Sequence, residues 1–211
     1  MNTIRLLFTS LLALIVSACA SSYRVVQPPQ YGADLYPRSQ TKSAITVAID
    51  EMNNPERVER LFGAELIGEG VLPVNVVVSN YGKQRLSVKP SDILLYQGKE
   101  VIDPIPVEMV MTIAKRQKNL YASTAGEVDK YFEASTFKET TVYPGETHRG
   151  VMFFAVPAPK RRLDRFFTMF TGYGDGGPKL RLGVTNQETG ERVVFAPFPV
   201  TLPDNAGRFS Y

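Results

Sequence analysis

The chain of 211 residues lacks several features on which common protein functions depend. It has one cysteine, Cys19, so no disulfide can form within it. It has one histidine, His148, and one His with one Cys cannot supply the ligand sets of the common zinc sites. It has no tryptophan, and charges of both signs are interspersed without a long block of either, which is not the pattern of a nucleic-acid-binding protein.

Long apolar runs are also scarce, and the first one ends too early to cross a membrane comfortably. Arg5 is followed by a run over residues 6–16 that only Thr9 and Ser10 interrupt. A membrane-spanning helix needs about 20 predominantly apolar residues, whereas the polar stretch ASSYRVVQPPQ follows Cys19 directly. A basic start and a short apolar run are typical of a signal peptide.

The end of this run resembles the lipobox of bacterial lipoproteins. Small residues precede the cysteine in the sequence Val16-Ser17-Ala18-Cys19. In that family the cysteine thiol is diacylglycerated, the peptide bond before it is cut, and the new amino terminus is usually acylated as well. The resemblance implies that residues 1–18 are a lipoprotein signal peptide and that Cys19 carries the acyl chains, palmitate among them. The alternative is an ordinary signal peptide cut within SACA, with Cys19 incidental.

The residues around the proposed cleavage site also predict where in the cell the protein is located. Two or three acyl chains would anchor the protein stably, because a single chain gives only marginal binding. Ala20 and Ser21 lack the Asp that resembles an inner-membrane retention signal in enteric-type bacteria. We therefore expect a lipid-anchored protein of the bacterial outer membrane that faces the periplasm. Removal of residues 1–18 takes away one cation, Arg5, and leaves a formal net charge of +2.

The mature chain is expected to consist of a flexible tether, residues 19–43, and a single domain, residues 44–211. The tether contains Pro28, Pro29 and Pro37 and shows no apolar period, which indicates a partly extended chain. The remainder is long enough for one domain with a sizeable core. With 15 prolines and 16 glycines in the whole chain, turn residues are frequent, which favours short strands.

The pattern of the domain predicts an all-β, immunoglobulin-like antiparallel sandwich of about seven strands with short inserted helices. Asn54, Pro55 and Gly63 have the spacing of a helix cap, a first helical residue and a C-terminal stop. Helical spacing recurs at 105–116 and 125–135, and residues 160–170 are ambiguous between strand and helix. Strands are predicted at residues 44–50, 71–79, 85–88, 93–97, 100–102, 142–143, 151–156, 180–184 and 193–195.

Three stretches of the domain resemble a known class of sandwiches. They are Asn80-Tyr81-Gly82, SDILLYQGKEV and VYPGETHRGVMFFAVP. Together they look like the immunoglobulin-like domains of secreted and lipid-anchored bacterial proteins grouped as domains of unknown function, with telokin-like and late-embryogenesis-abundant-like sandwiches as the nearest named relatives. The resemblance spans residues 70–157 with gaps and departs at the helical insertion. It implies a fold and no defined activity.

The acidic residues do not form a pattern that indicates catalysis or metal binding. Asp50-Glu51, and Asp92 with Asp103, lack the spacing of a calcium loop or of a catalytic pair, so we expect solvated strand ends. His148, in GETHRG, is expected to be a surface turn residue. We therefore predict a protein that is not an enzyme and that needs neither a cofactor nor a metal.

Two other stretches offer candidate binding features. The glycine-rich residues 171–179, TGYGDGGPK, are expected to form a turn between strands, because a phosphate-binding loop would be followed by a helix. Residues 160–167, KRRLDRFF, either contact anionic head groups or form a polar sheet edge with its aromatics in the core. This basic and aromatic patch is the best candidate for a ligand or partner surface, and its members are Arg161, Arg162, Arg165, Phe166 and Phe167.

These observations lead to one main functional hypothesis and two alternatives. The main hypothesis is a lipid-anchored, non-enzymatic envelope protein that acts as an interaction or accessory module for an envelope protein partner, since sandwiches often present loops or an edge strand. The first alternative is a periplasmic binder of a small apolar or anionic ligand, in a groove near Phe153, Phe166 and Phe167 rimmed by Arg161 and Arg162. The second is an enzyme, disfavoured because no pair of residues has nucleophile-and-base spacing. No nucleic-acid partner is expected.

Overall fold

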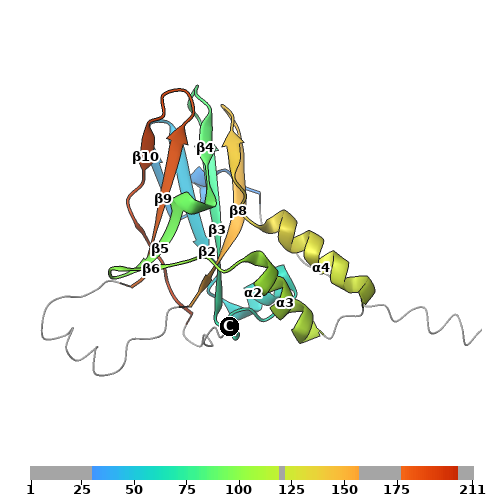
Figure 1. Cartoon of the computed structure of the whole chain (residues 1–211). Coiled ribbons are helices and arrows are strands. Elements are labelled where there is room, and N and C mark those ends of the chain that lie inside the picture. Colours follow the sequence, from blue (N-terminus) through green and yellow to red (C-terminus); the bar gives the residue numbers. More distant parts are fainter. Residues whose placement is uncertain (1–29, 119–121, 157–176, 204–211) are drawn as a thin grey trace, which may run out of the picture.

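Apolar residues at alternate strand positions turn toward a common core, and the chain accordingly folds into two antiparallel β-sheets stacked face to face (Figure 1). The computed structural model describes residues 30–118, 122–156 and 177–203. The first sheet has the order β1-β2-β3-β8, formed by Ser39–Lys42, Ile45–Glu51, Val71–Asn80 and Thr147–Ala155. The second has the order β6-β5-β9-β4-β7, formed by Glu100–Ile102, Ile93–Gln97, Lys179–Asn186, Leu86–Val88 and Thr140–Val142.

Two further short strands, β10 (Arg192–Val194) and β11 (Phe198–Pro199), pair with β9. The predicted all-β sandwich with short helices is therefore confirmed. The described residues form eleven strands instead of about seven, and six of the eleven have four residues or fewer. The finer resemblance to immunoglobulin-like and telokin-like domains stays a prediction.

The central strand of the first sheet, β3, is buried at all ten positions. One of its faces packs on the second sheet. The other, called the outer face here, lies under residues 30–38, the N-terminal strap, where Ala33 packs on Ala48 and Val77. A strand covered on both faces reads as a nearly continuous apolar run, which accounts for the sequence VLPVNVVVSN.

The strap shows that the predicted tether is wrong in its C-terminal part. It contains a 3₁₀ turn, η2 (Ala33–Leu35), and continues into β1, which pairs with β2 from Ser39 opposite Ala48 to Lys42 opposite Ile45. The sequence hid this strand for two reasons. β1 is an edge strand and largely exposed, so it carries no apolar alternation. Its turn to β2 uses Ser43 and Ala44 at φ 50° and 58°, without the Gly or Asn that usually marks such a turn.

The helix α2 (Pro55–Phe62) follows its sequence signals closely. The Asn54 side chain accepts a hydrogen bond from the Arg57 amide at 2.9 Å, and Gly63 ends the helix at φ 61°. Val58, Leu61 and Phe62 form its buried face. The predicted cap, start and stop of this helix are confirmed.

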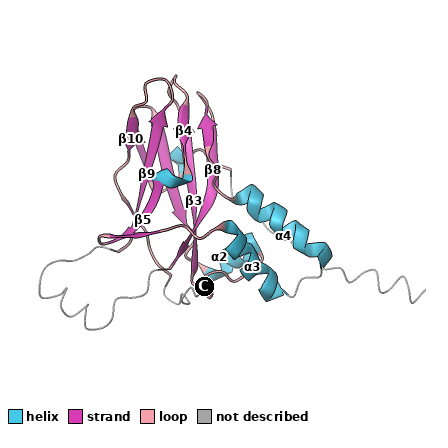
Figure 2. Cartoon of the chain, viewed as in Figure 1, coloured by secondary structure: helices cyan, strands magenta, loops and turns pink. Residues whose placement is uncertain are grey.

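The helices α3 (Val107–Lys118) and α4 (Ala122–Ser135) belong to one excursion between β6 and β7. Figure 2 shows α2, α3 and α4 gathered near one end of the strands. The excursion is tied to β8 at both ends, because Ile105 N donates to Phe153 O at 2.7 Å and Phe137 N donates to Val151 O at 3.0 Å. These contacts cover the edge of the first sheet, which would otherwise offer unpaired backbone groups. Among the described residues, no helix is long and apolar enough to cross a bilayer.

Candidate functional site

A cavity of about 130 Å³ lies between the helices α2 and α4 and the outer face of the first sheet. It exists because α2 follows β2 and α4 precedes the segment that pairs with β8, so both helices cross the same end of the sheet. Its apolar lining comes from Met52, Leu61, Phe62, Tyr131 and Val151. Polar lining comes from Asn75 and Arg149 on the sheet and from Gln30 and Ser135 nearby.

An aromatic cluster forms one side of this cavity. The Phe62 ring of α2 stacks on the Phe132 ring of α4 with centroids 5.5 Å apart, and it meets the edge of Phe153 at 5.6 Å. Tyr131 approaches Phe62 edge-on at 6.2 Å. Such pairs contribute beyond simple area burial and hold the rings in fixed orientations. The wall is therefore a packed part of the core.

The floor of the cavity contains a polar side chain in an unusual place. Asn75 lies in the middle of β3 and is 3% exposed. The only hydrogen bond of its carboxamide in the described part of the chain runs from Nδ2 to the Tyr36 hydroxyl at 3.4 Å, which is long for such a bond. Burial raises the pKa of the Tyr36 phenol, and the nearby Asp50 adds to this, whereas Arg149 opposes it. The floor thus combines a buried amide with charged groups of both signs nearby.

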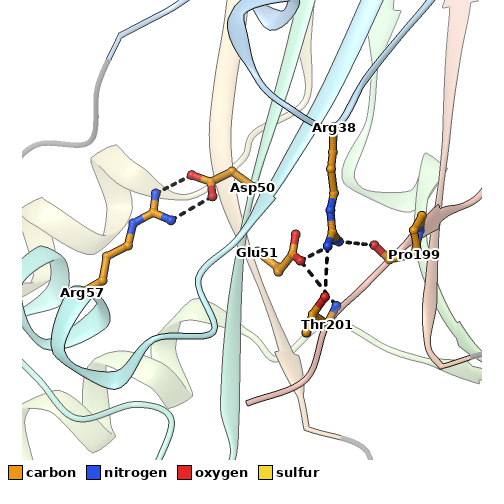
Figure 3. A network of polar contacts seen from close by, with 6 residues as sticks. All are labelled: Arg38, Asp50, Glu51, Arg57, Pro199 and Thr201. Carbon is orange, nitrogen blue, oxygen red and sulfur yellow. Dashed lines mark hydrogen bonds and ion pairs between the residues drawn. The ribbon is translucent and has the colours of Figure 1, made fainter. Parts of the chain in front are cut away.

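Consecutive residues of β2 send their carboxylates to opposite faces of the sheet (Figure 3). Asp50 points to the outer face and binds the guanidinium of Arg57 through both oxygens, Oδ1 at 2.8 Å, and this hydrogen bonding raises the pKa of Arg57. Glu51 points the other way and binds Arg38 at 2.5 Å. Each carboxylate has its own cation, so the Asp50-Glu51 pair does not converge on one point.

Comparison of the fold with solved structures finds several distant similarities. No family model matches the chain, and no curated protein matches it either. The crystal structure of a candidate lipoprotein of Bacillus subtilis, ycdA, has a TM-score of 0.37 at 18% identity, covering 79% of this chain and 38% of that one. The yjhA protein of the same organism has a TM-score of 0.39 at 11% sequence identity, and the match covers 75% of this chain and 94% of that one. A functionally unknown protein of Listeria monocytogenes has a TM-score of 0.35 at 14% sequence identity, and the match covers 88% of this chain and 96% of that one. None of these values assigns a family or a function.

The structure tests only some of the predicted site residues. The described residues do not include the lipidation candidate Cys19 or the basic and aromatic patch of Arg161, Arg162, Arg165, Phe166 and Phe167. Of the predicted ligand groove only Phe153 is described. It is 1% exposed and belongs to the aromatic cluster beside the cavity.

The prediction for His148 is wrong. The strand β8 begins at Thr147, four residues before the strand predicted at residues 151–156, so His148 lies within β8 and not in the turn. It is half-buried, with its ring edge-on to Phe137 at 4.9 Å, and in the described part of the chain its Nε2 is buried without a hydrogen-bond partner. Burial lowers the pKa of His148, Arg149 adds to the effect, and a hydrogen bond with the Lys138 backbone opposes it.

Of the four acidic residues singled out earlier, three are paired rather than merely solvated, and the fourth, Asp103, is exposed. Besides Asp50 and Glu51, Asp92 receives a hydrogen bond from Arg192 at 2.6 Å. Within the described ranges, no three His, Cys, Asp or Glu side chains are arranged to hold a metal ion. Of the glycine-rich stretch, the part from Gly177 is described, and it leads into β9 at Lys179, as expected of a turn followed by a strand.

Sequence reasoning missed the cavity residues Asn75, Arg149 and Tyr131. One signal was available, since Asn75 interrupts the apolar run VLPVNVVVSN at a position that faces the same side as Asp50 in the strand register. A buried amide in such a run needs an explanation. No comparable signal marks Arg149 or Tyr131, because their convergence depends on how β8 and α4 cross β3.

Proposed function

We propose that this chain is a lipid-anchored, non-enzymatic cell-envelope protein whose sandwich domain acts as an interaction or accessory module. The observation that carries the proposal is the sequence Val16-Ser17-Ala18-Cys19 at the end of a short apolar run. Acylation at that cysteine explains why a secreted chain would keep one thiol without a partner for it. The proposed location is the bacterial outer membrane, with the domain facing the periplasm.

The start of the folded part limits how far the domain can stand from such an anchor. The strap makes its first described hydrogen bond to the sheet at Ala33, whose amide donates to Ser79 Oγ at 2.9 Å. Residues 20–32 therefore separate Cys19 from the fold. Even fully extended, 13 residues reach no more than about 45 Å. The partner we propose is accordingly an envelope protein at or near the membrane surface.

An edge of the second sheet supports an interaction role. The strand β6 ends that sheet and pairs with β5, and Val101 on it is 44% exposed. Edge strands offer main-chain hydrogen bonds to a strand of another protein. A photo-crosslinking amino acid at Val101 should capture a specific envelope protein in intact cells. The matched control places the same amino acid at Lys130 on the exposed side of α4, and equal capture from both positions would count against this role.

The anchor itself is tested by metabolic labelling with an alkyne palmitate. The wild-type protein should be labelled, and Cys19→Ser should lose the label and remain uncut, because the acylated thioether forms on that sulfur. The matched control restores a thiol three residues later, as Cys19→Ser with Ser22→Cys. We expect no label on it, since the position after the small residues, and not the presence of a thiol, defines the substrate. An unlabelled wild type, with a mature terminus other than residue 19, would show an ordinary secreted protein.

A further inference from the structure

The cavity beside α2 and α4 has the dimensions of a small-molecule site. Its volume is about 130 Å³, and a 150 Å³ apolar cavity engineered into another protein holds benzene. The apolar side chains of Leu61, Phe62 and Tyr131 supply a hydrophobic wall. Such a wall with a few polar groups at one side is the usual composition of ligand sites. Its size suits a compact molecule with one small ring or one branched chain.

The buried amide of Asn75 also points to a ligand, independently of the size of the cavity. Asn75 is only 3% exposed, and it lines the cavity. Within the described residues its side chain makes one hydrogen bond, which is 3.4 Å long. A carboxamide has two N–H donors and an acceptor oxygen, so at least one donor and the oxygen remain available toward the cavity. A poorly bonded buried amide costs stability. Its place in an otherwise apolar strand is explained if a ligand completes its hydrogen bonds.

The charge around the cavity favours an anion. Arg149 lines it directly, and Arg57 and Asp50 lie close enough to act with Arg149 on the Tyr36 phenol. Arg57 is paired with Asp50, and Arg149 is the cation that lines the cavity itself. A guanidinium has five N–H donors in a planar fork, so it can hold a carboxylate while keeping other contacts.

We propose that this cavity binds a small carboxylate with a compact apolar body, such as an aromatic or branched-chain acid. The apolar body lies against Phe62, Leu61 and Tyr131. The carboxylate accepts hydrogen bonds from the Arg149 guanidinium and from the Asn75 amide nitrogen. This site is separate from the lipid anchor, and its occupancy does not depend on acylation.

The test is a ligand-observed NMR titration of the full-length protein with sodium benzoate, using benzamide as the neutral molecule of the same shape. Benzoate should bind, and benzamide should bind about tenfold more weakly or worse, because it lacks the charge that strengthens hydrogen bonds to Arg149. Arg149→Met should weaken benzoate binding to the level of benzamide. Equal binding of both molecules, or no binding of benzoate by the wild type, overturns the proposal.

A cavity-filling variant locates the binding. Ala134 is exposed on α4 and lines the cavity, so Ala134→Phe should block benzoate while leaving core contacts intact. Lys130→Phe, one turn earlier on the same helix, is the matched control and should bind as the wild type does. If Ala134→Phe binds benzoate unchanged, the site is elsewhere and the proposal is wrong.

Asn75→Leu separates a binding role from a structural one. Leu has the same branched shape and the same number of side-chain heavy atoms as Asn and needs no hydrogen bonds, so this variant should unfold at a higher temperature than the wild type while binding benzoate less tightly. A lower unfolding temperature would show that Asn75 serves the fold, and the role we assign to it would be lost.

Discussion

At the scale of the residue, His148 gives the domain a defined response to acid. Its pKa is lowered chiefly by burial, so the folded protein binds this proton less readily than the unfolded chain, whose histidine titrates near about 6.5. Below that pH the unfolded state takes up more protons. The free energy of unfolding should therefore fall as the pH drops below about 6.5, and the loss should level off below the folded-state pKa.

Urea denaturation at about pH 7.5 and 5.5 measures this loss. His148→Gln, which stays neutral, should lose less stability over that interval than the wild type. His148 is the one histidine of the chain, so no other imidazole can contribute. The same pH dependence in both proteins would mean that protonation of His148 has no cost in the fold.

At the scale of the element, the contact between β8 and the segment that follows α4 depends on a glycine. A Cβ built on Gly150 would lie 2.6 Å from the Phe137 backbone nitrogen and closer still to its Cα, and backbone cannot move aside as a side-chain tip can. Gly150→Ala should lower the free energy of unfolding by about 1–3 kcal/mol. The matched control is Gly126→Ala in α4, where nothing lies within 4 Å, and it should raise stability by up to about 1 kcal/mol. Chemical denaturation of both variants checks the opposite signs.

The elements also show which parts of the structure could be predicted from the sequence. α2 was predictable because its cap, its first proline and its final glycine are local signals, and β3, β5 and β6 because their boundaries are marked by turn residues. β1 was not, since an exposed edge strand owes its conformation to pairing with β2 rather than to its own side chains. The cavity was unpredictable for a related reason. Its walls come from α2, α4, β3 and β8, and only their crossing brings Asn75 and Arg149 together.

At the scale of the whole molecule, Arg38 joins the beginning and the end of the described domain (Figure 3). Its guanidinium binds Glu51 of β2 at 2.5 Å and donates to Pro199 O at 2.5 Å and Thr201 Oγ1 at 3.0 Å. Glu51 is 8% exposed, so removal of Arg38 would leave a largely buried carboxylate without this cation. Arg38→Met should lower the free energy of unfolding by about 1–3 kcal/mol.

Hydrogen exchange should show which part of the domain Arg38→Met destabilises. The amide of Val200, which donates to Pro178 O, should exchange faster in this variant than in the wild type. Lys89→Met is the control, because the Lys89–Glu139 pair is exposed on both sides. An exposed pair contributes at most about 1 kcal/mol. Equal effects of the two substitutions would show that Arg38 contributes no more than an ordinary surface ion pair.

The N-terminal strap has a mechanical consequence in the lipid-anchored form that we propose, in which Cys19 holds the protein at the membrane. Any tension on the anchor reaches the domain at the strap, and the first described attachments there are Ala33 to Ser79 and Asp34 to Tyr81, with the Tyr81 hydroxyl donating at 2.5 Å. Both lie at the end of β3, which is hydrogen-bonded on either side by β2 and β8. The force is thus applied to β3, the most deeply buried strand, before it reaches β1. The edge strand β1 is therefore not the first strand to be pulled from the sheet.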